Sequence, residues 1–166
     1  KKWDFGASFS NDFSVQIDKG IAKQLKASQK QVLTLRVWND NDLVGITTTS
    51  DLSEIGLKKA LFQASLASQY GNKNEKIDFS PLSKDPIKFL NTKKINPSGI
   101  TKLLNVLRNA ETNLLKKHEA IKSIPYNGLS ESFFKRVYAN SDGASRSYEK
   151  SQAAIYLYAR AEETNR

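Results

Sequence analysis

Two β-rich runs separated by a short polar turn constrain this chain more than any other stretch. Residues 32–38 (VLTLRVW) and 43–49 (LVGITTT) are rich in β-branched and aromatic residues, and each has the length of a strand. Residues 39–42 (NDND) lie between them. Asn and Asp favour turns because they tolerate left-handed backbone and hydrogen-bond to it locally. The stretch predicts an antiparallel hairpin, since its acidic residues lack the ligand spacing of a calcium loop.

A helix is expected directly after this hairpin. Asp51 predicts its N-cap, and Glu54 stands three residues further on, as in a capping box. Gly71 is expected at C′, just past the helix end, a position that often takes left-handed backbone. The helical spacing of four apolar residues predicts a buried side, formed by Leu57, Leu61, Ala64 and Ala67.

A second helix is expected after a polar connector. Asn96 and Pro97 predict its start, with Asn as the cap and Pro at the first helical position. His118 is expected in its last turn, where positive charge complements the helix dipole. Apolar residues repeat at the spacing of one buried stripe, namely Ile100, Leu103, Leu104, Leu107, Ala110 and Leu114.

Further strands are expected at both ends of the chain. Residues 3–9, 13–17 and, more weakly, 21–27 precede the hairpin, and residues 133–139 and 153–161 follow the second helix. This order predicts an α+β fold, in which two main helices pack on a mostly antiparallel β-sheet. Along the chain, we expect a β-rich N-terminal subdomain ending in a helix, a connector, and a helix followed by antiparallel strands, over residues 1–71, 72–96 and 97–166.

Composition narrows the classes of function. The 166 residues contain no cysteine, which excludes disulfides, thiolate metal sites and a cysteine nucleophile. No apolar run approaches the length of a membrane helix, and the N-terminus lacks the apolar core of a signal peptide. The net charge of +9 is compatible with nucleic-acid binding. Because the lysines are scattered and no Arg-rich run occurs, a generally basic surface is the preferred interpretation.

Two short motifs suggest catalysis but lack the residues that catalysis needs. His118 and Glu119 could begin a zinc-peptidase helix, which needs a second histidine four or five residues after the first. Lys122 and Ser123 stand at those positions, and the chain has no other histidine. Ser147-Tyr148-Glu149-Lys150 fits a Ser-x-x-Lys pattern, yet it is expected between strands rather than at a helix start. We therefore assign no catalytic, cofactor-binding or metal residue.

Two segments of the chain resemble the TldD/PmbA family, also called modulators of DNA gyrase. The first covers residues 35–71, and its matching residues are Gly45, Thr49, Ser50, Asp51, Leu52, Ser53 and Ala60. The second covers residues 118–163, and Val137, Asn140, Ser141 and Gly143 carry the match. The expected helix from Asn96 to His118 falls where the family has its central helix. The Thr-Ser-Asp-Leu-Ser form is more similar to the PmbA (TldE) branch than to the TldD branch.

The resemblance implies a role within a larger protein. The family is similar to cytoplasmic metallopeptidases that often pair a TldD-type with a PmbA-type subunit. Its zinc-binding motif lies in a C-terminal domain that this chain is expected to lack, so no cofactor is expected here. The parent would be a metallopeptidase or its non-catalytic partner subunit.

The resemblance also implies what this chain itself does. We expect a non-catalytic N-terminal domain that serves assembly and peptide-substrate access, in a homo- or hetero-dimer with a TldD/PmbA-type subunit. Unfolded peptide is the expected substrate, and no membrane partner is expected. The alternative is a basic binding module for nucleic acid or a gyrase-related partner, although nucleic acid is not the expected ligand.

Overall fold

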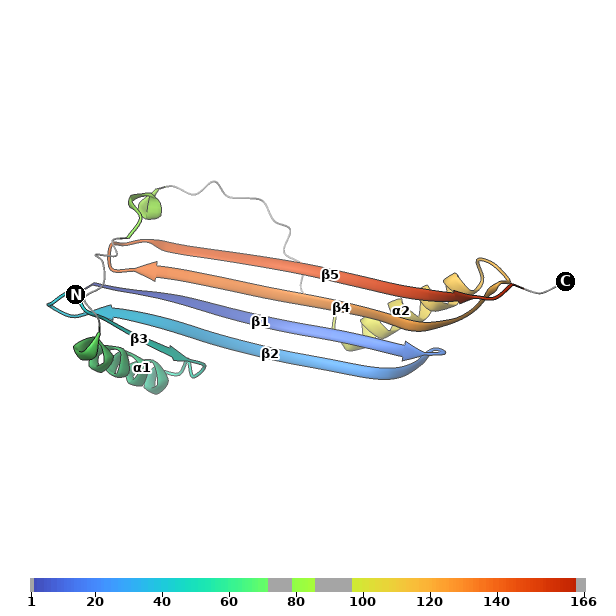
Figure 1. Ribbon diagram of the computed structural model, residues 1–166, viewed down its shortest axis with the longest axis horizontal. Coiled ribbons are helices and arrows are strands. Elements are labelled where there is room, and N and C mark those ends of the chain that lie inside the picture. The colour runs from blue at the N-terminus through green and yellow to red at the C-terminus, as the bar shows by residue number, and fades with distance from the viewer. Residues whose placement is uncertain (1, 72–78, 86–96, 164–166) are drawn as a thin grey trace. The chain divides into compact units, whose positions relative to one another are not determined.

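The computed structural model describes residues 2–71, 79–85 and 97–163. Its sheet has five strands in the order β3-β2-β1-β4-β5, and neighbouring strands run in opposite directions (Figure 1). The prediction of an α+β fold with a mostly antiparallel sheet and two main helices is confirmed. No helix in these described ranges is long and apolar enough to cross a membrane.

The strands are β1 (Trp3–Asp18), β2 (Ile21–Trp38), β3 (Val44–Thr49), β4 (Ile121–Asn140) and β5 (Ser145–Ala161). The helices are α1 (Glu54–Ala67) and α2 (Ile100–Leu115), with short 3-10 helices η1 (Ser68–Tyr70) and η2 (Pro81–Lys84).

The strands are longer than their apolar patterns predicted. The expected strands over residues 3–9 and 13–17 are parts of one strand, β1. The strand expected over residues 133–139 is the end of β4, which begins at Ile121, soon after α2. Polar residues fill the intervening positions and interrupt the apolar alternation on which strand prediction depends. Pairing with neighbouring strands supplies the backbone hydrogen bonds that these segments need.

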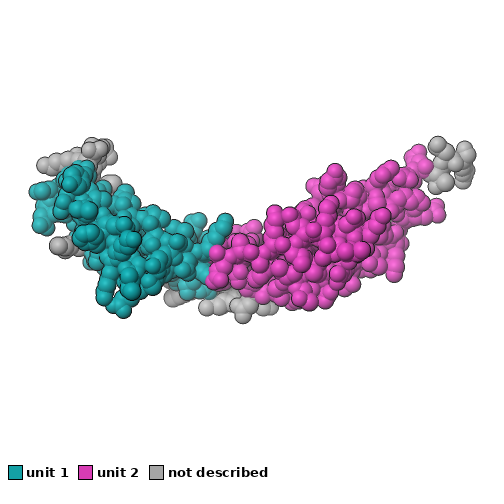
Figure 2. Space-filling view, turned by 90° about the horizontal axis from the view of Figure 1, so that it is seen from below, with its two compact units in different colours: residues 1–9, 30–93, 134–149 teal, residues 10–29, 94–133, 150–166 magenta. Residues whose placement is uncertain are grey.

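The chain forms two compact units, each assembled from three segments (Figure 2). Unit 1 comprises residues 1–9, 30–93 and 134–149, and unit 2 comprises residues 10–29, 94–133 and 150–166. Strands β1, β2, β4 and β5 each contribute residues to both units. Each unit therefore draws residues from both sides of the expected connector, residues 72–96, and the proposed subdomains along the chain stay a prediction.

Within unit 2, helix α2 packs on strand β1 through the predicted leucine stripe. Leu103 and Leu107 form a fully buried cluster with Val15 and Ile17 of β1. Fully burying an aliphatic side chain of this size stabilises a fold by about 1.5–3 kcal/mol. Partly buried apolar residues surround the cluster, namely Phe13, Ile100, Leu104, Leu129 and Leu157.

The ends of α2 differ from the sequence prediction. The helix begins at Ile100, with Gly99 as N-cap at a φ of 81°. Pro97 therefore precedes the helix, and the predicted cap Asn96 lies outside the described residues. The helix ends at Leu115, so His118 is not in its last turn. Left-handed backbone at Gly99 sets the start of this helix, and the sequence pattern did not indicate it.

Within unit 1, helix α1 packs on strand β3 through small residues. Its buried residues are Gly56, Ala60 and Ala64. Gly45 of β3 faces this side of the helix so closely that an added Cβ would lie 1.8 Å from the backbone oxygen of Ala64. The side chain of Leu61, expected to be buried, is 50% exposed. The helix thus approaches the strand backbone to backbone, and its leucines do not form the contact.

Both ends of α1 also differ from the predicted capping pattern. Ser53 is the N-cap, and its hydroxyl oxygen accepts a hydrogen bond of 3.1 Å from the amide of Gly56. Asp51 stands outside the helix, where its carboxylate accepts a 3.0 Å hydrogen bond from the amide of Ser53. Gly71 has extended backbone, with φ −65° and ψ 153°. It is close-packed, because an added Cβ would lie 2.7 Å from the backbone oxygen of Val44.

Candidate functional site

His118 and Glu119 lie in the turn between α2 and β4. The Nδ1 atom of His118 accepts a 3.1 Å hydrogen bond from the amide of Ala120, and its carbonyl accepts one from Ile121. The histidine thus organises the entry into β4. Across residues 2–71, 79–85 and 97–163, no three His, Cys, Asp or Glu side chains form a group that could hold a metal ion. The described residues therefore do not fit the zinc of a metallopeptidase.

Ser147 and Lys150 lie on strand β5. Successive side chains of a strand point to opposite faces of the sheet, so residues three apart lie on different faces. The lysine therefore cannot activate the serine hydroxyl within this strand. The Ser-x-x-Lys motif works at the start of a helix, whereas these two residues lie within a strand.

The loops over residues 39–43 and 140–144 share one hydrogen-bond pattern. In each, the side-chain oxygen of the first residue, Asn39 or Asn140, accepts from the amides two and four residues further on, at 2.9–3.1 Å. The fourth residue is left-handed in both, with φ 61° at Asp42 and 91° at Gly143. The turn predicted at residues 39–42 is confirmed. The family-matching Asn140 and Gly143 have the same structural role.

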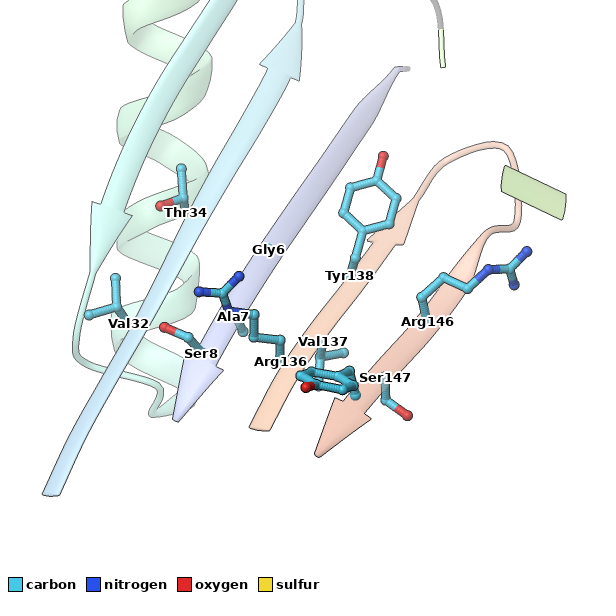
Figure 3. A pocket seen from close by; sticks show the side chains of 11 residues that line it. Gly6, Ala7, Ser8, Val32, Thr34, Arg136, Val137, Tyr138, Arg146 and Ser147 are labelled. Carbon is cyan, nitrogen blue, oxygen red and sulfur yellow. The ribbon is translucent and has the colours of Figure 1, made fainter. Parts of the chain in front are cut away.

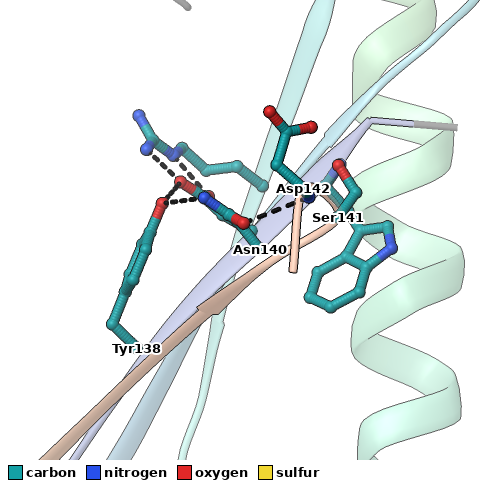
Figure 4. Close-up of polar contacts among 7 residues, drawn as sticks. Tyr138, Asn140, Ser141 and Asp142 are labelled. Carbon is teal, nitrogen blue, oxygen red and sulfur yellow. Dashed lines mark hydrogen bonds and ion pairs between the residues drawn. The ribbon is translucent and has the colours of Figure 1, made fainter. Parts of the chain in front are cut away.

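A partly buried polar network joins the second loop to strands β1 and β2 (Figure 4). Asp4 is 2% exposed, and both of its carboxylate oxygens accept from the guanidinium of Arg36, with the Nε bond at 2.8 Å. Tyr138 donates its hydroxyl to Asp4 at 3.2 Å, and Asn140 donates to that hydroxyl at 3.3 Å. The hydrogen bond to Asp4 raises the pKa of Arg36. The network neutralises one guanidinium and fixes the β4–β5 loop.

A hollow of about 460 Å³ lies beside this network, on the sheet of unit 1 (Figure 3). Strands β1, β2, β4 and β5 all contribute residues to it. Figure 3 shows the Arg136 side chain extending from β4 toward β1. Gly6 leaves room there, because an added Cβ would meet no atom within 4 Å. We call this space the Arg136 hollow; its side chains include Ser8, Thr34, Arg136, Tyr138, Arg146 and Tyr148.

A second hollow, of about 600 Å³, lies on unit 2 and is rich in hydroxyl groups. Its polar residues are Asp12, Ser14, Lys26, Ser28, Ser130 and Ser132. Within each unit, the polar lining residues come mostly from even-numbered positions of the strands, while Val15 and Ile17 of β1 face α2. Sequence reasoning missed both hollows. Their only signal was the polar residue at every second position of β1, which predicts a strand with one open face.

Comparisons with known proteins agree with the family resemblance. Residues 93–166 match the family model of the PmbA/TldA metallopeptidase central domain. A search of curated proteins found no match. TldE from Thermococcus kodakarensis has a similar structure, with a TM-score of 0.78 and 17% identity over 98% of this chain and 37% of that chain.

Two further solved structures have the same fold. One is a putative modulator of a DNA gyrase from Thermotoga maritima, with a TM-score of 0.74 and 15% identity over 99% of this chain and 37% of that chain. The other is a putative modulator of DNA gyrase from Bacteroides thetaiotaomicron, with a TM-score of 0.67 and 15% identity over 98% of this chain and 38% of that chain. This chain thus spans 37–38% of the length of these proteins.

At these identities the solved structures show the fold, while the family model links the sequence itself to the family. The matched model describes a central domain, whereas the sequence motifs suggested an N-terminal region. The resemblance to the TldD/PmbA family is therefore confirmed, by the family model over residues 93–166 and by a shared fold over nearly the whole chain.

Proposed function

We propose that this chain is a non-catalytic domain of a TldD/PmbA-type metallopeptidase-family protein, serving assembly and peptide-substrate access. The observation that supports assembly is that large apolar side chains are exposed on the outer side of α1. Ile55, Phe62 and Leu66 are 80%, 68% and 46% exposed, and their spacing places them on one side of the helix. We call these three residues the apolar outer face of α1.

The apolar outer face lies away from the residues that pack on β3. The buried residues Gly56, Ala60 and Ala64 occupy the other side of the helix. Exposed apolar side chains gathered on one surface often mark a contact with another protein. Covering a large apolar side chain stabilises a complex by up to about 1.5–3 kcal/mol. The occupant that we propose is a TldD/PmbA-type subunit.

Sedimentation velocity of the protein mixed with a TldD-type subunit tests this proposal. We expect a complex at micromolar concentration that Phe62→Asp abolishes, because a charge would be placed in an apolar contact. Ser65→Asp is the matched control, since it adds the same charge to another exposed position of α1. A complex that withstands Phe62→Asp as well as Ser65→Asp would contradict the proposed surface.

Peptide hydrolysis tests the non-catalytic assignment. We expect the purified protein to leave an unfolded peptide intact, with or without added zinc, and the mixture with a TldD-type subunit to cleave it. Turnover by this protein alone that His118→Ala abolishes would overturn the assignment.

The alternative, nucleic-acid binding, draws on three exposed lysines. Lys23, Lys26 and Lys30 lie on β2 before residues 33–38, the part of β2 that pairs with β3. Lysines on an unpaired strand edge also discourage aggregation, which explains them without a ligand. Titration with duplex and single-stranded DNA over a salt series separates the two explanations. Nanomolar binding with a steep salt dependence would favour nucleic acid, and binding at low salt alone would exclude it.

A further inference from the structure

The Arg136 hollow carries positive charge because a carboxylate neutralises Arg36 beside it, whereas no carboxylate of the described ranges forms an ion pair with Arg136 or Arg146 in its lining. Arg36, beside it, is bound by both oxygens of Asp4. Arg146 donates to the backbone oxygens of Ser145 and Asp85, which carry no net charge. Among the described residues, no carboxylate forms an ion pair with Arg136, whose contact is with the ring of Phe134. An unneutralised guanidinium beside a hollow is suited to an anionic ligand.

Two acidic residues of unit 1, one in the β4–β5 loop and one on β5, have lysine partners. Asp142 lies 4.0 Å from the ammonium of Lys84, and Glu149 lies 3.1 Å from that of Lys135. The residues that line the hollow include two arginines and no acidic residue. An incoming anion would therefore meet attraction without a competing negative charge in the lining.

The guanidinium of Arg136 lies over an aromatic ring. Its central carbon lies 5.2 Å from the ring centre of Phe134, within the range of a cation–π contact. Tyr148 packs edge-on against that ring at 5.7 Å between ring centres. A contact of this kind favours one orientation of the guanidinium, which reduces the conformational entropy lost on binding a ligand.

We propose that the Arg136 hollow binds the carboxylate of an extended peptide. The planar guanidinium can donate to both carboxylate oxygens at once, which gives a bidentate pair. Ser8 and Thr34 line the same hollow and carry hydroxyl groups for further polar contacts. A phosphate dianion fits less well, because Arg146 is already engaged with two backbone oxygens.

This site is distinct from the proposed assembly surface. Its lining residues come from the strands, and the apolar outer face belongs to α1. Phe62→Asp is therefore expected to leave carboxylate binding unchanged. Failure of one proposal can then be recognised without reference to the other.

Titration followed by NMR of the backbone amides of Gly6 and Ser8 tests the proposal. The probes are tetra-alanine with a free C-terminus, an acetylated and amidated tetrapeptide with one central Glu, and acetylated, amidated tetra-alanine. We expect at least one carboxylate peptide to shift both amides with a Kd below about 10 mM, a weak but measurable affinity. Whichever binds more tightly identifies the source of the carboxylate. The peptide without a carboxylate is expected to bind at least tenfold more weakly.

Two variants test the geometry. Arg136→Gln is expected to weaken binding at least tenfold, because it removes a charge-assisted bidentate pair. Arg160→Gln is the matched control: it removes the same charge from an exposed residue of unit 2, and its affinity should stay within twofold. Gly6→Val should also weaken binding, because it places a side chain in the hollow without changing charge.

Several outcomes would overturn the proposal. One is equal affinity in Arg136→Gln and Arg160→Gln. Another is that neither carboxylate peptide shifts the amides of Gly6 and Ser8 up to about 10 mM. A third is inorganic phosphate binding as tightly as the peptides, which would make the hollow a general oxyanion site.

Discussion

Helices α1 and α2 both pack on sheet strands, but they do so by opposite means. Helix α2 inserts Leu103 and Leu107 against β1, and these side chains are 1% and 0% exposed. Helix α1 brings alanines against Gly45 and leaves Phe62 exposed. The core under α2 needs large side chains that fill the space between helix and strand. The contact of α1 with β3 needs small residues, because any added side-chain atom would push the two backbones apart. The two helices should therefore respond oppositely to changes in side-chain size.

Each helix is also tied to a hairpin loop. Helix α2 binds the β1–β2 turn at Gly20, whose carbonyl accepts from Arg108 and whose amide donates to Glu111, both at 2.7 Å. At the end of α1, Ser68 accepts a 2.7 Å hydrogen bond from the side chain of Asn39. These polar contacts fix where each helix lies along the strands, because a shift would leave partly buried polar groups without partners.

The largest effect is expected from Leu107→Ala. The change removes a fully buried side chain and leaves a cavity, which typically costs about 2–5 kcal/mol in the free energy of unfolding. Urea denaturation followed by circular dichroism measures this loss.

Phe62→Ala is the control on α1. Because Phe62 is 68% exposed, its truncation should change the free energy of unfolding by about 0.5 kcal/mol or less. Equal losses in the two variants would mean that α1 depends on its large apolar residues as α2 does, and the contrast between the helices would be wrong.

A smaller effect is expected from Gly45→Ala. The new methyl group would overlap the backbone oxygen of Ala64, so α1 must move away from β3, at a cost of about 1–3 kcal/mol. Thermal denaturation and amide hydrogen exchange of α1 measure the change.

Gly6→Ala is the matched control for Gly45→Ala. Gly6 also lies on a strand, but an added Cβ would meet no atom within 4 Å. Its substitution should be neutral or slightly stabilising, since Ala restricts the unfolded chain. If Gly45→Ala destabilised no more than Gly6→Ala, the close backbone packing of α1 would not be important for stability.

Local patterns predicted the parts of this fold that depend on local interactions. The hairpin around residues 39–42 and the leucine stripe of α2 are correct, because turn chemistry and helical periodicity act over a few residues. The packed side of α1 was predicted only in part. The apolar spacing correctly indicated Ala64, but it also indicated Leu61, whereas close packing against Gly45 of a neighbouring strand selects the small residues Gly56 and Ala60.

The candidate site was beyond sequence reasoning for a similar reason. Gly6 and Arg136 are on β1 and β4, far apart in the sequence, and they line one hollow because these strands are neighbours in the sheet. Strand order is set by tertiary pairing, which local patterns do not determine. The sequence could only indicate that β1 has a polar face.

The smallest effect is expected at the N-terminal ends of the helices. The pKa of Asp51 is lowered below the usual 3.8 because its carboxylate accepts hydrogen bonds from the hydroxyl and, to a smaller extent, the amide of Ser53. Gly99, in contrast, gives α2 no side-chain cap. A lowered pKa in the folded state stabilises the protein above the unfolded pKa, and this contribution disappears as pH falls through the folded pKa. Asp51→Asn should therefore lower the melting temperature slightly at neutral pH, and the difference from the wild type should vanish toward about pH 2.

Asp40→Asn is the control, on an exposed residue of the β2–β3 loop. A difference between Asp51→Asn and the wild type that stays constant from neutral to acidic pH would show that the Asp51 charge does not stabilise the start of α1.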